Sequence, residues 1–503
     1  MQETASLESI QNFEGKYPKQ IWSLFFSEMW ERFCFYGMRG MLTFFMVTEL
    51  AFNEKDAQLQ YGATQAFVYA FTFIGGLFAD KILGFRKSLF WGGLLMIAGS
   101  LILALDPEKF FFLGISFTVV GTGFFKPNIS TMVGRLYKDG DSRRDAGFSL
   151  FYSGINIGAL LGGYLCIAIG KGQIFASAIP ENLRWNIAFG LAAVVMTISL
   201  LTFLFTKKDL GPIGLSPLLH TEGRKRSILE VLVYIGALAA IPLIMKMVAK
   251  TEYTDYFMYI IGPATLLYLL FEMTRHSAAE VKKLFAALVF IIFSIVFWAF
   301  FEQSGGSLSI FAAYNLENDL FGLNLDPNGV NNSSNALFVI IFAPIIGLGW
   351  IALAKKKMEP NTVVKFGLGF LFLALAFYIL YSTRFFASVD GITSLEVFTF
   401  AYFVMTMGEL FLSPIGLSIM TKLSPAKLQG VMMGMWFLAS AYGQYVAGIL
   451  GAGMTSADEN APNTVKLMAF TDGYLQLAIY AAIAGVVLIV ISPLVRKLMQ
   501  DVK

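Results

Sequence analysis

Charged residues are scarce in this chain of 503 residues, because Asp, Glu, Lys and Arg together make up 14% and hydrophobic residues make up 56%. This balance is expected where lipid rather than water contacts most of the folded surface, so we do not expect a soluble enzyme. The net charge of +3 provides no basic field for nucleic acid. The composition therefore predicts a protein that lies mostly within a lipid bilayer and binds no nucleic acid.

Cysteine and histidine are also rare, with two residues of each. Cys34 and Cys166 lie in apolar stretches, so neither a disulfide framework nor a cysteine-based metal site is predicted. The first twenty residues lack the pattern of a secretory leader, and we expect none to be removed. Because no nucleophile or metal set stands near the bilayer, we expect no enzymatic activity, no metal and no cofactor.

Long apolar runs recur along the chain. A helix needs about 20 mostly apolar residues to cross roughly 30 Å of hydrocarbon, and the sequence predicts fourteen such spans in an all-α polytopic membrane protein. With the N-terminus placed in the cytoplasm, most Lys and Arg fall in cytoplasmic loops, and both termini lie on that side. The spans lie near residues 20–48, 58–79, 87–105, 110–134, 146–169, 184–206, 228–249, 254–274, 281–302, 333–354, 362–381, 395–421, 427–453 and 470–495.

The longest predicted cytoplasmic linker covers residues 207–227. It contains Gly211, Pro212, Gly214 and Pro217 with a basic run, and it separates six spans from eight. Two halves that meet around a central cavity are the arrangement expected of many secondary transporters.

Ionisable residues stand inside the first predicted span. Glu28, Arg32, Tyr36 and Arg39 follow steps of four, four and three and share one helical face, with Glu31 slightly aside. A charge at mid-membrane costs at least roughly 2.5 to 3.5 kcal/mol on insertion scales, so such residues usually face a cavity or a partner. The alternative is internal neutralisation that merely lets the helix insert, which apolar residues would achieve at lower cost.

Lys126, in GTGFFKPN, is another intramembrane charge that needs a carboxylate partner. Later spans offer Glu302 in FWAFFEQ and Glu409 in MGELFLSP. Trp298 shares a face with Glu302, and Ser413 shares one with Glu409. The spacing leaves open which acid meets which base.

Tyr152 and Asn156, in FYSGINIGALLGG, share a helical face and are candidates for a cavity. Gly154, Gly158 and Gly162 recur every four residues on an adjacent face, which indicates close helix packing.

At these residues the chain resembles the proton-dependent oligopeptide transporter (POT, peptide transporter) family of the major facilitator superfamily. The matching motifs are spread over both halves of the chain. They are ExxERF (Glu28, Glu31, Arg32, Phe33), FYxxINxG (Phe151, Tyr152, Ile155, Asn156, Gly158), the superfamily loop from Gly75 to Ser88, and the core spans around Phe297, Trp298, residues 301–303 and Glu409 to Pro414.

The resemblance implies a major facilitator fold of two six-helix bundles with two extra helices between them. The N-terminal bundle would cover residues 1–206, the basic linker 207–227, the inserted helices 228–275 and the C-terminal bundle 276–503. Animal relatives carry a large extracellular domain where this chain has only residues 382–394, so the resemblance implies a bacterial inner-membrane protein.

The resemblance also implies a proton-coupled symporter that imports di- and tripeptides by alternating access, with peptide-like drugs as candidate substrates. Arg39 and Lys126 would attract the peptide carboxylate, and Glu409 and Asn335 would receive its amino terminus. The other implied peptide-binding residues are Tyr36, Tyr69, Tyr152, Asn156, Trp298, Ser413 and Trp436, the proton-coupling residues are Glu28, Glu31, Arg32 and Glu302, and the gate pairs are Lys126 with Glu409 and Arg39 with Glu302.

One departure from the family pattern concerns the pocket, because many members have Tyr-Tyr where this chain has Phe35-Tyr36. One hydroxyl group is therefore missing, and side-chain preference is expected to shift. The alternatives to peptide transport are a related carrier of nitrate, an amino acid derivative or a drug, a membrane-embedded enzyme and a passive channel.

Overall fold

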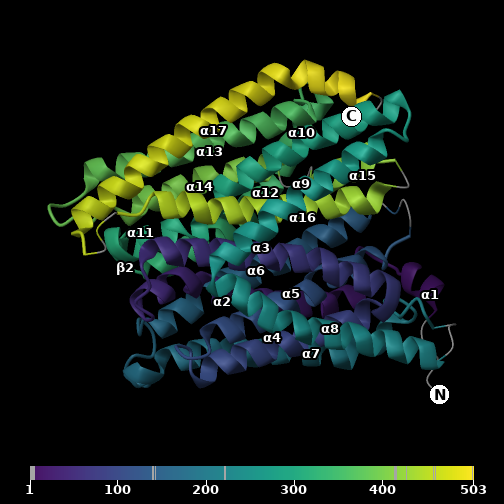
Figure 1. The fold of residues 1–503 in the computed structure, drawn as a ribbon, viewed down its shortest axis with the longest axis horizontal. Coiled ribbons are helices and arrows are strands. Elements are labelled where there is room, and N and C mark those ends of the chain that lie inside the picture. The colour runs from purple at the N-terminus through teal and green to yellow at the C-terminus, as the bar shows by residue number, and fades with distance from the viewer. Residues whose placement is uncertain are drawn as a thin grey trace. The chain divides into compact units, whose positions relative to one another are not determined.

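The computed structural model describes residues 6–138, 141, 143–219, 223–412, 416–425, 428–456, 458, 460–500 and 502, without the side chains of residues 416–418 and 421. In these ranges the chain is almost entirely helical (Figure 1), with one antiparallel hairpin of strands β1 (Asp319–Leu320) and β2 (Leu323–Asn324). The contacts between residues divide the chain into two compact units. The first unit is Met1–Met41 with Phe67–Ala249, and the second is Leu42–Ala66 with Lys250–Lys503.

In the first unit, helix α4 packs along both α5 and α7. Glycines allow this close approach, because a Cβ atom at Gly92 would lie 2.5 Å from the carbonyl oxygen of Gly121. The unit contains α1 (Leu7–Gln11), most of α2 (Gln20–Thr48), the end of α3 (Glu54–Phe78), η1 (Ala79–Leu83), α4 (Phe85–Leu105), α5 (Phe111–Gly134), α6 (Arg143–Gly170), η2 (Glu181–Leu183), α7 (Arg184–Thr206), η3 (Lys207–Leu210) and α8 (Gly223–Ala249).

In the second unit, α13 packs along α17 and α14 around a core rich in phenylalanine. Helix α10 begins at a capping box, in which Ser277 and Glu280 satisfy each other's backbone N–H groups. Besides the end of α2 and the beginning of α3, the unit contains α9 (Thr251–Met273), α10 (Ala278–Phe301), η4 (Glu302–Gly305), α11 (Ser307–Asn315), α12 (Pro327–Lys355), α13 (Thr362–Ser382), η5 (Thr383–Phe386), α14 (Leu395–Leu412), α15 (Gly416–Leu423), α16 (Gln429–Gly453) and α17 (Asn463–Met499).

Thirteen of the fourteen predicted spans coincide with one long helix each, namely α2 to α10, α12, α13, α16 and α17. The span predicted at 395–421 corresponds to α14, to residues 413–415 outside the described ones and to most of α15. Among the described residues, 11 helices are long and apolar enough to cross a membrane by length and composition. Helices α2, α5 and α16 are not among these, and α2 is the helix that carries the predicted intramembrane charges. The predicted all-α membrane class is confirmed.

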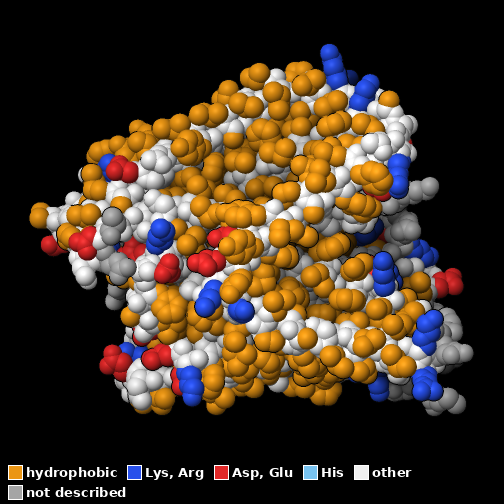
Figure 2. All heavy atoms as spheres, in the orientation of Figure 1, with side chains coloured by type: hydrophobic (Ala, Val, Ile, Leu, Met, Phe, Trp, Pro, Cys, Tyr) orange, Lys and Arg blue, Asp and Glu red, His pale blue; other side chains and the backbone are white. Residues whose placement is uncertain are grey.

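Apolar side chains are exposed along the long helices rather than hidden. Figure 2 shows that hydrophobic side chains dominate the surface over α13 and α17, in the upper part of the view. On α17 the exposed residues include Ile483 at 57% and Val490 at 70%. A large exposed apolar surface on well-packed helices is typical of contact with lipid, so the chain is a multi-pass membrane protein.

The two helices of the predicted insertion, α8 and α9, belong to different units. In the first unit, Lys87 of α4 forms an ion pair of 2.6 Å with Glu230 of α8. In the second unit, the hydroxyl group of Tyr445 on α16 donates to Asp255 of α9. Only Lys250 stands between the last residue of α8 and the first of α9, so the two helices are joined without a loop.

The linker after η3 is anchored to η1 and to the first turn of α4, within the first unit. Arg86 donates hydrogen bonds to the carbonyl oxygens of Ile213 (2.6 Å) and Gly211, and Ser216 donates to that of Ile82. Gly84 lies between them with φ +77°, where a side chain would be strained. The linker is therefore ordered as far as Leu219, and residues 220–222 lie outside the described residues.

Candidate functional site

Three charges on α2 form a buried cluster in the first unit, which we call the α2 cluster: Glu28, Glu31 and Arg32. Each of these residues is at most 2% exposed. The Arg32 Nε atom lies 2.7 Å from Glu28 Oε1 and 3.0 Å from Glu31 Oε2. One guanidinium therefore faces two carboxylates, and a proton on either carboxylate would balance the charge of the cluster.

The remaining carboxylate oxygens of the α2 cluster are not satisfied. Glu28 Oε2 and Glu31 Oε1 are buried and have no hydrogen-bond partner among the described residues. An unpartnered carboxylate oxygen is costly in a low dielectric, whereas a protonated one can act as a donor. The cluster is thus suited to exchanging a proton.

Helix α6 positions this cluster through its glycine face. A Cβ atom at Gly158 would meet the Met29 carbonyl and lie 2.9 Å from Arg32 Cβ, and one at Gly162 would meet the Phe33 carbonyl. The close packing predicted from the glycine spacing is confirmed, and it brings the α6 backbone against the helix that carries the cluster.

The two predicted carboxylate-binding cations lie over aromatic rings. The Lys126 ammonium lies 4.6 Å from the centre of the Tyr69 ring and 5.9 Å from that of Phe35. The Arg39 guanidinium lies 5.7 Å from the centre of the Tyr36 ring. Cation–π contacts of this kind position a cationic side chain without neutralising it.

Phe35 contacts two of these cations. Its ring lies 5.9 Å from the Arg32 guanidinium carbon and 5.9 Å from the Lys126 ammonium. Phe35 therefore links the α2 cluster to Lys126 through its ring. The departure from the family pattern at this position retains the ring and removes only the hydroxyl group.

The polar residues of α6 are turned partly toward their own helix. Asn156 Nδ2 donates to the Tyr152 carbonyl oxygen at 2.9 Å, one helical turn earlier. Asn156 is 6% exposed and Tyr152 is 37% exposed. The Tyr152 side chain is therefore more exposed to solvent than the Asn156 side chain.

In the second unit, the structure brings together the two residues predicted to receive a peptide amino terminus. The Asn335 side-chain amide on α12 donates to Glu409 Oε2 on α14 at 2.6 Å and contacts Thr406 Oγ1 at 3.3 Å. Glu409 is 8% exposed and has no ion pair within the described part of its unit. Its only polar side-chain partner there is a neutral amide.

The other predicted residues of the second unit that the structure describes lie on α10, η4 and α16. Glu302 is 4% exposed and follows the last residue of α10. Trp298 packs against Phe301 with ring centres 5.5 Å apart, and Trp436 lies on α16 at 8% exposure. Ser413 lies outside the described residues. The gate pairs join residues of different units and remain predictions.

Several contacts in the structure were not predicted from the sequence. Thr406 beside Asn335 stands one turn before Glu409, a spacing that could have been noticed. The ion pair between Glu54 and Lys466 was not predicted, because the two residues are far apart in the sequence and both stand at the ends of apolar runs.

Comparisons with known proteins cover the chain from end to end. Residues 86–468 match the model of the POT family. The chain is 33% identical to peptide transporter YePEPT of Yersinia enterocolitica, over 100% of this chain and 99% of that protein. It is 28% identical to dipeptide and tripeptide permease A of Pectobacterium carotovorum, over 99% of this chain and 95% of the relative.

Solved structures agree with the fold. A crystal structure of peptide transporter POT in complex with sulfate has a TM-score of 0.81 and 31% identity, and the match covers 99% of this chain and 100% of that one. The predicted fold and the predicted family resemblance are both confirmed. The family model, the full-length relatives and the solved structure together place this chain in the POT family.

Proposed function

We propose that this protein is a proton-coupled symporter that imports di- and tripeptides across a bacterial inner membrane by alternating access. The observation that carries the proposal is the α2 cluster, in which one arginine is shared by two buried glutamates inside a membrane helix. Buried acids that compete between a proton and a basic partner can couple proton binding to a change of contacts. Relatives named dipeptide and tripeptide permease A and di-/tripeptide transporter support peptides as the substrate.

The recognition of the peptide rests on its two end charges. Arg39 and Lys126 attract the carboxylate, while Asn335 and Glu409 receive the amino group. Fixed charges of opposite sign select short zwitterions and leave the side chains free to vary. A solved relative bound to alafosfalin supports peptide-like molecules as additional substrates.

The change of facing state uses two charge pairs in this proposal. Lys126 approaches Glu409 when the cytoplasmic side closes, and Arg39 approaches Glu302 when the outer side closes. Cytoplasmic N- and C-termini follow from the distribution of Lys and Arg among the loops.

The experiment that tests this function is uptake of labelled dialanine into proteoliposomes, with an imposed proton gradient and with the gradient collapsed by an ionophore. We expect accumulation only with the gradient, and competition by unlabelled dialanine but not by dialanine blocked at both ends. Uptake that is insensitive to the gradient would indicate a passive channel. If the end-blocked peptide competes as well as dialanine does, recognition through end charges is contradicted. If dialanine does not compete with another transported solute, a different substrate class is favoured.

A further inference from the structure

A buried ion pair lies in the second unit, away from the residues assigned above. Lys466 Nζ lies 2.7 Å from Glu54 Oε1, and both side chains are 8% exposed. Glu54 is the first residue of α3, and Lys466 lies in the first turn of α17. The Lys466 ammonium also lies 4.1 Å from the centre of the Tyr314 ring. We call the Glu54–Lys466 contact the tip ion pair.

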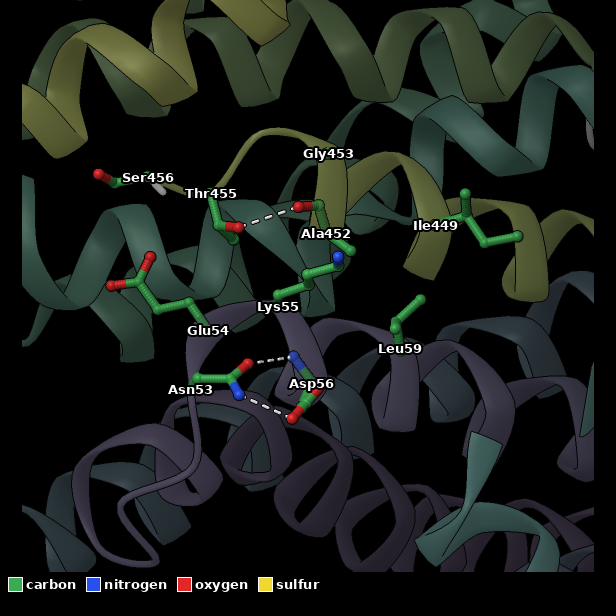
Figure 3. A pocket seen from close by; sticks show the side chains of 10 residues that line it. All are labelled: Asn53, Glu54, Lys55, Asp56, Leu59, Ile449, Ala452, Gly453, Thr455 and Ser456. Carbon is green, nitrogen blue, oxygen red and sulfur yellow. Dashed lines mark hydrogen bonds between the residues drawn. The ribbon is translucent and has the colours of Figure 1, made fainter. Parts of the chain in front are cut away.

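The tip ion pair borders a cavity of about 620 Å³. Figure 3 shows that Asn53 forms hydrogen bonds with Asp56 at one wall of the cavity and that the Thr455 hydroxyl group donates a hydrogen bond to the Ala452 carbonyl oxygen at another. Glu54 belongs to the lining, and its Oε2 atom is buried without a hydrogen-bond partner among the described residues. Water in the cavity can therefore solvate this carboxylate once the pair separates.

Helix α3, which carries Glu54, crosses between units, as does α2 before it. Helix α2 passes from the first unit into the second after Met41, and α3 returns to the first unit at Phe67. The intervening segment, Leu42–Ala66, is grouped with the second unit by its contacts, and we call it the α2–α3 tip. Because both helices continue unbroken into the other unit, any rearrangement between units acts on the contacts of this tip.

The packing around the tip ion pair is close but has few polar bonds. A Cβ atom at Gly62 would lie 2.8 Å from the Gly448 Cα atom, so α3 and α16 meet backbone to backbone. Gln58 is fully buried, and neither end of its side-chain amide has a hydrogen-bond partner among the described residues. Small residues let the two helix backbones approach closely, whereas the unsatisfied Gln58 amide makes the packed state less favourable.

We propose that the tip ion pair holds the α2–α3 tip in the second unit and breaks once in every transport cycle. This inference rests on the alternating access of the proposed function. The predicted topology places the tip on the outer side, so breaking the pair opens the path from outside. A buried ion pair suits this role because losing one partner leaves an uncompensated charge, so the pair selects one arrangement strongly over its alternatives.

Spin labels can test the proposal without any peptide. Cysteines placed at the exposed positions Glu49 and Met468 can be labelled selectively, because the native Cys34 and Cys166 are buried. We expect Glu54→Gln and Lys466→Met each to increase the population with a long label-to-label distance several-fold. The charge exchange Glu54→Lys with Lys466→Glu should restore much of the short-distance population.

Lys55→Met is the matched control for Lys466→Met, because it also removes one positive charge. Lys55 directly follows Glu54, is exposed and forms no ion pair among the described residues. It should leave the distances unchanged. Unchanged distances in Glu54→Gln and Lys466→Met would overturn the proposal, as would a charge exchange that restores nothing in protein that elutes as one folded species.

A second measurement tests the proposal even if the Glu54 and Lys466 variants fold poorly. Cysteines at the exposed positions 49 and 468, joined by a bifunctional maleimide, should stop dialanine uptake, whereas either single cysteine treated alike should not. Uptake that continues after complete crosslinking would contradict the proposal. Because unmodified protein is assayed in parallel, absence of dialanine uptake there would count against the proposed function instead.

Discussion

The α2 cluster and the Asn335–Glu409 pair both bury glutamate inside the membrane, but they compensate its charge in opposite ways. Glu28 and Glu31 lie within 3.0 Å of one arginine, whereas Glu409 contacts a neutral amide at 2.6 Å. An acid that already has a basic partner can only exchange that partner for a proton. An acid bonded to an amide alone retains its capacity for an incoming ammonium group, so the first region is suited to coupling and the second to recognition.

The largest effect is expected from removing a titrating group of the α2 cluster. Glu31→Gln or Glu28→Gln should abolish uptake driven by a proton gradient, while exchange of internal for external peptide is largely retained. Glutamine keeps the volume and hydrogen-bonding capacity of glutamate but cannot bind the proton that biases the facing states. The measurement is gradient-driven uptake beside counterflow in the same proteoliposomes.

The control for these variants is Glu49→Gln, which changes an exposed acid directly after the last residue of the same helix. It should behave like the wild type in both assays. If the cluster variants still accumulate dialanine against its gradient with unchanged pH dependence, these glutamates support only packing, and coupling belongs to Glu302 or Glu409.

The next effect sharpens the recognition side of the comparison. Glu409→Gln should weaken dialanine binding by roughly 10- to 100-fold, because a hydrogen bond to a charged group contributes about 1.5 to 3 kcal/mol. A dipeptide acetylated at its amino end should bind the variant and the wild type equally. Competition assays with both ligands measure this, with the exposed Glu317→Gln as control. An equal loss for both ligands would mean that Glu409 does not receive the amino group.

A smaller effect is expected where the α2 cluster meets the recognition residues. Phe35→Leu removes the ring over which Arg32 and Lys126 lie, and each cation–π contact contributes about 0.5 to 2 kcal/mol. The KM for dialanine should rise several-fold, while Phe35→Tyr should stay near the wild type. Phe26→Leu, on the exposed face of the same helix, is the control. A Phe35→Leu variant with an unchanged KM would show that the ring does not position Lys126.

Much of this architecture could be predicted from the sequence because a membrane imposes a length and a polarity on each helix. The apolar run at 87–105 lies within α4 (Phe85–Leu105), and the step of four between Glu28 and Arg32 gave a direct ion pair. The run at 281–302 also predicted α10, but not the short helices η4 and α11 that follow it. Hydropathy does not distinguish a straight span from one that ends and restarts.

Contacts between distant segments were beyond such reasoning. Asn335 and Glu409 came together in the prediction only through the family resemblance, since no periodicity relates two separate helices. The partnership of Glu54 and Lys466 likewise depends on how α3 and α17 pack, and the assignment of α8 and α9 to separate units depends on side chains of α4 and α16. Spacing along a chain fixes neighbours within a helix and leaves neighbours between helices open.

The most direct test of the central claim is proton movement caused by peptide alone. Proteoliposomes that contain a pH-sensitive dye, with no initial pH or voltage gradient, receive an inward dialanine gradient. Symport predicts acidification of the interior that saturates with dialanine, is absent with dialanine blocked at both ends and is lost in Glu31→Gln. Labelled dialanine that enters wild-type vesicles while the internal pH stays constant would contradict proton-coupled transport by this protein.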